Sequence, residues 1–464
     1  MTALVDQLKD IVGPKGWTVD PSEMESHLHD WRGAYSGLAA IVVKPASTEQ
    51  VVAVVKACGA AGIAIVPQGG NTSLCGAATP DTSGDQVVLS LSRMNQVRGV
   101  DTENFSMEVE AGCILASAQE AARAAGRFLP LSLGAEGTCQ VGGNIATNAG
   151  GLNVGRYGTA RSLVLGLEVV LADGTVLDSL RALRKDTAGY DLKQLFIGSE
   201  GTLGIITAAV LRIYPDPGET STALVGLSSA SSAVTLLAAM KGRLSDRIES
   251  FELLPKRVFD LVEKHIPDAR LPFAIEHPWY VLIESATNDV PERLEEALMA
   301  EAENEAILDA VVAKNASEAD ALWRVRHAIA EAEKKEGRAL KHDISVPLSS
   351  MEDFLVRGDE LLAGLRPDHE LVAFGHVGDG NLHYNVVLPR DLSDEEWQSE
   401  GRRITGALYE LVDELGGSFS AEHGVGQAKK AWLAEYRGGS ELALMKTLKK
   451  TLDPANILNP GKVI

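Results

Sequence analysis

The sequence has few aromatic residues, few cysteines and no long apolar run. Aromatic residues make up 5% of its 464 residues, and its four cysteines (Cys58, Cys75, Cys113 and Cys139) contain no Cys-x-x-Cys pair. This argues against a disulfide framework and against a thiolate-bound iron–sulfur or zinc site, and it fits a reducing compartment. No stretch of about 18 apolar residues occurs, so the sequence predicts no transmembrane helix.

Positive charge is also scarce. The chain has 43 Lys and Arg residues against 64 Asp and Glu residues, a formal net charge of −21, which argues against nucleic acid or an anionic membrane surface as a partner. An anionic substrate is still compatible with this charge, because a pocket on an acidic protein can be locally positive. The N-terminus carries acidic residues and lacks the apolar core of a signal peptide, so we expect a cytoplasmic protein.

The Gly-x-Gly-x-x-Gly fingerprint of a Rossmann dinucleotide site is missing as well, which argues against an NAD-dependent dehydrogenase. The sequence instead carries three glycine-rich blocks, at 67–76, 133–151 and 198–204. Glycine lets the backbone approach a ligand closely, and successive N–H groups can form an anion-binding nest. Each block alone could be a simple turn, but three such blocks around one site indicate a large flat ligand.

The order of predicted strands and helices divides the chain. A β-α-β unit spans residues 39–66, and Ser47 and Gln50 match a capping box at the start of its helix. The segment 214–218 is Tyr-Pro-Asp-Pro-Gly, which is typical of a domain boundary. Beyond it, strands alternate with helices in a pattern that predicts an α+β arrangement with an antiparallel sheet.

The stretch 374–385 predicts a β-hairpin. Residues 378–381 (Gly-Asp-Gly-Asn) have turn chemistry and separate two apolar runs. A four-residue loop would pair His376 with His383, and His376, His383 and Asn385 would project from the same face. The two imidazoles would then be close enough to bind one metal ion. The alternative is a hairpin with two unrelated polar residues on a wet face.

A catalytic metal with an open coordination position needs a third protein ligand. The segment 420–426 offers Glu422 and His423, which would point to opposite sides of an extended chain. Glu422 could bind the ion while His423 faces the substrate as a base. The reverse assignment stays open, as does a surface turn with an incidental Glu-His pair. Arg324, Arg326 and Lys341 supply positive charge for a substrate carboxylate, and the alternative for each is an ordinary surface position.

Six motifs of the sequence resemble those of the FAD-linked D-2-hydroxyacid dehydrogenases, which share the flavin fold of vanillyl-alcohol oxidase and p-cresol methylhydroxylase. In chain order they are Pro67–Ser73, Gly142–Gly151, Arg184–Leu192, Gly198–Gly204, Gly375–His383 and Ala421–Gly426. The resemblance extends over nearly the whole chain. It implies an α+β protein with a p-cresol methylhydroxylase-type FAD-binding domain and an N-terminal helix at 1–218. An antiparallel-sheet substrate- and metal-binding cap domain would follow at 219–415, and a C-terminal helical segment at 416–464 would complete the active site.

The resemblance also implies roles for individual residues. FAD would be held by Pro67, Gly69, Gly70, Asn71, Thr72, Ser73, Gly134, Gly137, Thr138, Gly142, Gly143, Asn144, Asn148, Gly150, Gly151, Gly201, Gly204, Ile205 and Asn459. It would be bound non-covalently, because the first two glycine blocks contain no histidine. His376, His383 and Glu422 would bind a divalent metal, with zinc preferred to iron because a flavin makes a redox metal unnecessary. His423 would be the general base. The substrate would be contacted by His423, Asn385, Arg326 and Lys341.

The implied reaction is the FAD-dependent oxidation of a D-2-hydroxyacid to the 2-oxoacid. The metal would assist deprotonation of the 2-hydroxyl group, and a hydride would pass to flavin N5. D-2-hydroxyglutarate is the expected substrate. Ala330 stands where relatives that use a five-carbon dicarboxylate can carry a hydroxyl residue, so D-malate also stays open, as do a D-lactate dehydrogenase and a glycolate-oxidase-type flavoprotein subunit. The resemblance further implies an electron-transfer flavoprotein as electron acceptor and a homodimer.

Overall fold

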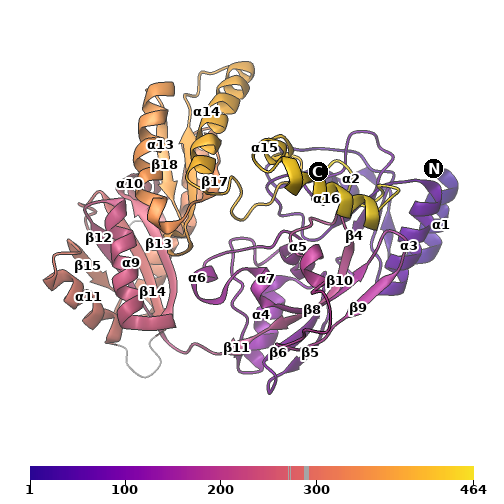
Figure 1. Ribbon diagram of the computed structural model, residues 1–464, viewed down its shortest axis with the longest axis horizontal. Coiled ribbons are helices and arrows are strands. Elements are labelled where there is room, and N and C mark those ends of the chain that lie inside the picture. The colour runs from indigo at the N-terminus through magenta and orange to yellow at the C-terminus, as the bar shows by residue number, and fades with distance from the viewer. Residues whose placement is uncertain (270, 272, 287–291) are drawn as a thin grey trace. The chain divides into compact units, whose positions relative to one another are not determined.

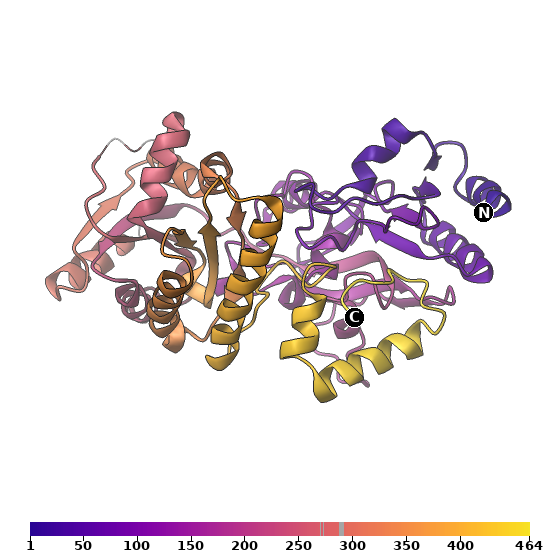
Figure 2. The same ribbon diagram turned by 90° about the horizontal axis from the view of Figure 1, so that it is seen from above.

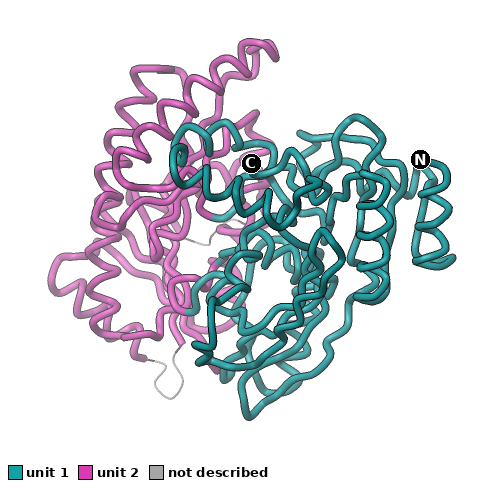
Figure 3. The backbone as a smooth tube through the Cα atoms, turned by 45° about the vertical axis from the view of Figure 1, so that its right-hand side comes forward, with its two compact units in different colours: residues 1–151, 157–216, 422–464 teal, residues 152–156, 217–421 magenta. Residues whose placement is uncertain are grey.

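The computed structural model describes residues 1–269, 271, 273–286 and 292–464, and the chain forms two compact units. Unit 1 comprises Met1–Gly151, Tyr157–Asp216 and Glu422–Ile464, and unit 2 comprises Leu152–Arg156 and Pro217–Ala421 (Figure 3). The C-terminal segment therefore belongs to the same unit as the N-terminal half of the chain. The division into three functional parts at residues 218 and 415 stays a prediction.

Unit 1 begins with helices around a small sheet whose strand order is β1-β2-β4-β3. The elements are α1 (Thr2–Val12), β1 (Trp17–Thr18), α2 (Pro21–Leu28), β2 (Ile41–Val43), α3 (Thr48–Ala61), β3 (Ile65–Gln68) and β4 (Val87–Ser90). β2 and β3 both run parallel to β4, as a β-α-β unit requires. Their apolar residues are almost fully buried because helices cover both faces of a parallel sheet.

The start of α3 differs in one detail from the predicted capping box. The Ser47 hydroxyl accepts the Gln50 N–H at 3.4 Å, as expected, but the Gln50 side chain accepts the N–H of Ala46, one residue before the predicted Ser47. The helix ends where predicted, at Gly62, which has the left-handed conformation (φ 66°).

The second sheet of unit 1 is antiparallel and has the order β5-β6-β10-β8-β9. Its strands are β5 (Val97–Asp101), β6 (Ser106–Glu110), β8 (Val164–Val170), β9 (Val176–Ser179) and β10 (Ile205–Arg212). β7 (Arg127–Phe128) pairs with β11 (Tyr214–Pro215). The helices are α4 (Leu115–Ala124), α5 (Val141–Ala146), α7 (Ala160–Leu163), α8 (Lys193–Phe196), α15 (Lys430–Tyr436) and α16 (Gly439–Leu452), and α6 (Val154–Tyr157) lies where the chain passes between units. One apolar core is shared by both sheets of this unit, and the two C-terminal helices are drawn in yellow in Figure 2.

Unit 2 contains two sheets whose strand pairings are antiparallel, which confirms the predicted arrangement (Figure 1). The first, β13-β14-β12-β15, consists of β12 (Thr220–Leu227), β13 (Ile248–Pro255), β14 (Trp279–Ala286) and β15 (Asp309–Val312). The second is built on β19 (Asn381–Val387), which pairs with β16 (Ala339–Leu340), β17 (Asp343–Ser345) and β18 (Glu370–Phe374). The helices are α9 (Ala230–Leu244), α10 (Lys256–His265), α11 (Arg293–Glu303), α12 (Ala316–Glu336), α13 (Met351–Leu365) and α14 (Asp394–Glu414). No helix in the described part of the chain combines the length and apolarity that a membrane crossing requires.

The hairpin of β18 and β19 has a different register from the predicted one. Phe374, and not His376, is paired with His383, and β18 ends there. Gly375 leaves the hairpin with φ 145° and exchanges two backbone hydrogen bonds with Leu253 on β13, at 2.8 and 3.1 Å. Residues 377–379 then form a 3-10 turn. The prediction was wrong because it ignored the neighbouring strand, which competes for the backbone of Gly375.

Candidate functional site

The three glycine-rich blocks lie against one another within unit 1. A Cβ on Gly70 would be 2.2 Å from the carbonyl oxygen of Thr138, so only glycine allows the first block to contact the second this closely. A Cβ on Gly201, in the third block, would be 3.1 Å from Cγ of Pro67. The structure therefore brings together three segments that are far apart in the sequence.

The second block is more regular than expected, because residues 141–146 form the short helix α5. Gly142 permits this: its N–H donates to the Ala111 carbonyl at 2.7 Å, and an added Cβ would be 2.6 Å from the Ala111 side chain. Gly142, which was predicted to hold the cofactor, thus also packs a helix against the end of β6.

Two buried oxygens beside these blocks fit a bound cofactor. Gln140 Oε1 and Asn144 Oδ1 have no hydrogen-bond partner among the described residues. Gln140 Oε1 would be 3.6 Å from a Cβ at Gly69. Buried acceptors are normally satisfied, and a flavin nucleotide carries N–H donors on its isoalloxazine ring and adenine. Asn144 was predicted as a cofactor residue; Gln140 was missed, although it lies within the second block, two residues before Gly142.

Other residues predicted to bind the cofactor have packing roles in unit 1. The Asn459 side chain is buried and donates to the carbonyl oxygens of Ala77 (3.0 Å) and Glu200 (2.8 Å). A Cβ on Gly204 would be 2.5 Å from the Val169 side chain, so this glycine fits β10 against β8. Several predicted positions have open space beside the backbone or an intermediate exposure, namely Gly134, Gly137, Gly143, Asn71, Thr72, Ser73 and Asn148. The roles of these residues stay predictions.

The carboxylate of Glu422 is held by the second glycine block. Its Oε1 accepts the N–H of Gly151 at 2.7 Å. A Cβ on Gly150 would be 2.6 Å from the same oxygen, so the preceding position must be glycine for the carboxylate to reach this donor. One carboxylate oxygen of the predicted metal ligand is thereby oriented by the backbone of unit 1.

In unit 2, the predicted metal ligand His376 is buried and makes a strong polar contact. Its Nδ1 lies 2.5 Å from Oε1 of Glu252, and Oε2 of Glu252 lies 2.6 Å from Nε of Arg326. Burial of the Glu252 carboxyl opposes its ionisation, but His376 and Arg326 outweigh this effect and hold its pKa below the ordinary range. A carboxylate on one ring nitrogen is the usual arrangement that orients a metal-binding histidine. Sequence reasoning missed Glu252, an acidic residue in the middle of the apolar strand β13.

His383 and Asn385 are two residues apart on β19 and therefore lie on the same face of the strand, as predicted from their spacing. The rings of His376 and His383 have centroids 5.5 Å apart, so the two histidines come together although the predicted register is wrong. Asp343, on the adjacent strand β17, places Oδ1 4.0 Å from Nδ1 of His383. It is a further possible metal ligand or orienting group that was not predicted.

The chain itself connects this part of unit 2 to the Glu-His pair. The N–H of Ala421 donates to the carbonyl oxygen of Asp343 at 3.2 Å. Glu422 and His423 are the next two residues of the chain. The predicted third ligand and base therefore follow directly, in the chain, the last residue of unit 2 that is bound to β17.

The two predicted substrate anchors both have buried acidic partners. Arg326 uses Nε for Glu252, and its guanidinium lies 5.0 Å from the centroid of the Phe374 ring. Lys341 Nζ lies 2.6 Å from Oε2 of Glu333, which is almost fully buried. Among the described residues, the two Nη groups of Arg326 have no hydrogen-bond partner, and these are the donors that form bidentate bonds with a carboxylate.

Comparison with known proteins identifies both halves of the chain. The family described as FAD binding domain matches residues 39–179, and the family described as FAD linked oxidases, C-terminal domain, matches residues 216–463. The D-2-hydroxyglutarate dehydrogenase of Xanthomonas citri pv. viticola is 39% identical, over 96% of this chain and 93% of that protein. The mitochondrial D-2-hydroxyglutarate dehydrogenase of Bos taurus is also 39% identical, over 96% of this chain and 80% of that protein.

Solved structures with the same fold include p-cresol methylhydroxylase with substrate bound. It superposes with a TM-score of 0.77 and 16% identity, over 100% of this chain and 96% of that chain. An alkyldihydroxyacetonephosphate synthase superposes with a TM-score of 0.73 and 18% identity, over 99% and 84% of the two chains. The fold class predicted from the sequence is therefore confirmed, and so is the resemblance to FAD-linked dehydrogenases.

Proposed function

Since the chain belongs to the FAD-linked oxidases, in the family of the D-2-hydroxyglutarate dehydrogenases, we propose that it oxidises D-2-hydroxyglutarate to 2-oxoglutarate with FAD as cofactor. The observation that carries this proposal is the chain of contacts Arg326–Glu252–His376 in unit 2. It links a residue suited to a substrate carboxylate with a histidine oriented as metal ligands usually are. A 2-hydroxydicarboxylic acid is the kind of substrate that needs both an arginine for one carboxylate and a metal ligand.

The bound metal would be held by His376, His383 and Glu422, and it would be zinc or a similar divalent ion. Two imidazoles and one carboxylate are a typical donor set for catalytic zinc with an open position. Glu252 on the His376 ring and the Gly151 N–H on Glu422 favour this role, because each fixes a ligand in orientation. When bound, such an ion lowers the pKa of a coordinated hydroxyl group.

FAD would be bound non-covalently by the three glycine blocks of unit 1, including Gly69, Gly70, Asn144 and Gly201. The unsatisfied oxygens of Gln140 and Asn144 support this placement. When bound, the flavin accepts the hydride from C2 of the substrate. His423 would take the proton of the 2-hydroxyl group as general base.

The far carboxylate of the substrate would be bound by Arg326, whose Nη groups make no hydrogen bond within the described ranges, and by Lys341. Glu252 holds the Arg326 guanidinium in place, and Asn385 would contact the substrate from β19, beside His383. Ala330 is exposed one turn after Arg326 on α12 and supplies no hydroxyl group. Discrimination between D-2-hydroxyglutarate and D-malate would therefore depend on the side chains of Arg326 and Lys341.

Reduced flavin would be reoxidised by an electron-transfer flavoprotein, the chain would work as a homodimer, and it would act in the cytoplasm.

Anaerobic flavin reduction tests the proposed function directly. Purified protein should show the absorbance of oxidised FAD, and D-2-hydroxyglutarate should bleach it. We expect slower bleaching by D-malate and D-lactate, and strongly reduced bleaching by every substrate after EDTA treatment, with recovery on adding zinc. Absence of bleaching by any D-2-hydroxyacid would show the proposal to be wrong, whereas faster bleaching by D-lactate would favour the lactate alternative.

A further inference from the structure

We infer that Glu200, in the third glycine block, is a positioning residue that holds the backbone carrying Glu422 and His423 in its working conformation. This inference rests on the proposed function, since it concerns the roles of those two residues. It is carried by three observations within unit 1: an unfavourable backbone conformation, a pair of hydrogen bonds to successive amides, and anchoring of Glu200 from both sides.

The backbone of Glu200 is in the left-handed region, with φ 51°. Its neighbours Gly198 and Gly201 have φ 81° and 73°, and glycine adopts such values easily. A residue with a side chain is disfavoured in this conformation, because its Cβ lies too close to the following carbonyl oxygen. A fourth glycine would fit the loop without that cost, so the presence of a carboxylate here requires a compensating interaction.

That interaction is with two successive backbone amides. Oε1 of Glu200 accepts the N–H of Val425 at 2.7 Å, and Oε2 accepts the N–H of Gly426 at 2.8 Å. Gly424 and Gly426 both have positive φ, 72° and 49°, which turns the amides toward the same point. The side chain of Glu200 thus fills the nest that the segment 424–426 forms.

The fit between the carboxylate and this segment is close. A Cβ on Gly424 would be 2.6 Å from Oε1 of Glu200, and a Cβ on Gly426 would be 2.1 Å from the carbonyl oxygen of Cys75. The segment therefore lies between Glu200 on one side and the first glycine block on the other. Because His423 directly precedes Gly424, the direction in which the His423 side chain leaves the backbone depends on this arrangement.

Glu200 is itself fixed to the rest of unit 1. Its N–H donates to the Ala146 carbonyl at 2.8 Å, and its carbonyl oxygen accepts from the Asn459 side chain at 2.8 Å. One residue therefore ties the second glycine block and the C-terminal tail to the segment that carries the proposed base. Burial raises the pKa of Glu200 to about 7, while the Val425 and Gly426 amides and the nearby Lys429 favour the charged form.

The test compares Glu200→Gln and Glu200→Gly with a matched control, Glu168→Gln. The Gln variant keeps the side-chain volume but presents an N–H group to one of the two amides. The Gly variant removes the carboxylate and relieves the backbone, so it keeps the experiment informative if the Gln variant folds poorly. Glu168 is also a largely buried carboxylate of unit 1, but it accepts from Thr48 and Thr207, each at 2.7 Å, and not from the segment 424–426.

Hydrogen exchange of the backbone amides is the readout that does not depend on catalysis. In both Glu200 variants we expect the amides of Val425 and Gly426 to exchange at least about tenfold faster than in the wild type. Exchange in this segment should be unchanged in Glu168→Gln. Unchanged exchange in the Glu200 variants, or equal acceleration throughout unit 1 in all variants, would overturn the inference.

Flavin reduction by D-2-hydroxyglutarate is the second readout. With FAD still bound, we expect both Glu200 variants to reduce the flavin at least about tenfold more slowly, with a shifted pH dependence and KM within about threefold of the wild-type value. A wild-type rate and pH profile in the Glu200 variants would contradict the positioning role. If the wild-type flavin is not reduced by any D-2-hydroxyacid, the proposed function fails, and hydrogen exchange still decides whether Glu200 orders the segment.

Discussion

Nδ1 of His376 lies 2.5 Å from Oε1 of Glu252, a residue 124 positions earlier in the chain. The contact joins the turn after β18 to the middle of β13, and both residues are buried. It means that the proposed metal ligand and the proposed substrate anchor Arg326 share one carboxylate, so a change at Glu252 should affect both.

Substitution Glu252→Gln should weaken metal binding. A neutral amide cannot balance both His376 and Arg326, and loss of a group that orients a metal ligand typically lowers metal affinity about 10- to 100-fold. Metal content after dialysis against graded EDTA concentrations measures this, and flavin reduction should fall in parallel. Glu249→Gln is the control, since Glu249 is a buried carboxylate on the same strand that pairs with Arg156. Equal metal loss in the two variants would contradict a specific role for Glu252.

Substitution Gly150→Ala should displace the carboxylate of Glu422 without changing residue 422 itself. The new Cβ would occupy a position 2.6 Å from Glu422 Oε1, so the carboxylate must leave the Gly151 N–H. We expect metal affinity to fall and, in the protein that carries FAD, flavin reduction to slow at least about tenfold. Gly99→Ala, on β5, has nothing within 4 Å of the new Cβ and should behave as the wild type. Flavin and metal content per chain are the measurements, and a Gly150→Ala variant with full metal content and rate would refute the argument.

The four cysteines should be unreactive in the folded protein. All are buried, and none forms a disulfide. Burial raises the pKa of the Cys58 thiol to about 12, so almost no thiolate is present at neutral pH. We expect a thiol-specific reagent to label native protein at least about a hundredfold more slowly than protein unfolded in guanidinium. Rapid labelling of a native cysteine would show that its surroundings open far more often than the packing indicates.

The sequence predicted elements whose signals are local. The helix α3 ends at Gly62 as expected, because glycine takes the left-handed cap conformation at little cost. The antiparallel strand pairing of unit 2 and the flavin fold were predicted correctly, the latter from long motifs in a fixed order, whereas the division of unit 2 into two sheets was not predicted. These features depend on neighbours in the chain or on a whole-family pattern.

The features that the sequence did not predict depend on contacts between distant segments. The register of the 374–385 hairpin changed because Gly375 pairs with Leu253 on another strand. Glu252 and Glu200 could not be recognised as partners of His376 and of the 425–426 amides, since no spacing along the chain indicates which buried carboxylate meets which donor. The one local signal that was available is the presence of acidic residues inside a buried strand, as Glu249 and Glu252 are in β13.

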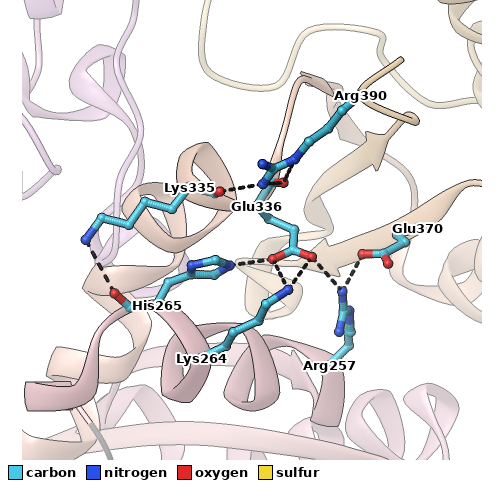
Figure 4. A network of polar contacts seen from close by, with 7 residues as sticks. All are labelled: Arg257, Lys264, His265, Lys335, Glu336, Glu370 and Arg390. Atoms are coloured by element: carbon cyan, nitrogen blue, oxygen red, sulfur yellow. Dashed lines mark hydrogen bonds and ion pairs between the residues drawn. The ribbon is translucent and has the colours of Figure 1, made fainter. Parts of the chain in front are cut away.

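Substitution Glu336→Gln should destabilise unit 2 in a pH-dependent way. Glu336 ends α12, and its carboxylate binds Lys264 and His265 of α10, with Arg257 nearby (Figure 4). Hydrogen bonds from Lys264 and His265 lower the pKa of Glu336 to about 2. Because this pKa is depressed, its stabilising contribution is complete above about pH 4.5 and is lost as the pH falls toward 2.

Thermal unfolding at several pH values measures this contribution. We expect Glu336→Gln to lose about 1–3 kcal/mol at pH 7, as for other charge-assisted hydrogen bonds, and to approach the wild type below about pH 3. Glu331→Gln serves as the control, because Glu331 is exposed on the same helix and pairs only with Lys335 among the described residues. A loss at Glu336 that is independent of pH would mean that the side chain acts through packing, and equal losses in both variants would mean that the Figure 4 network adds nothing beyond a surface ion pair.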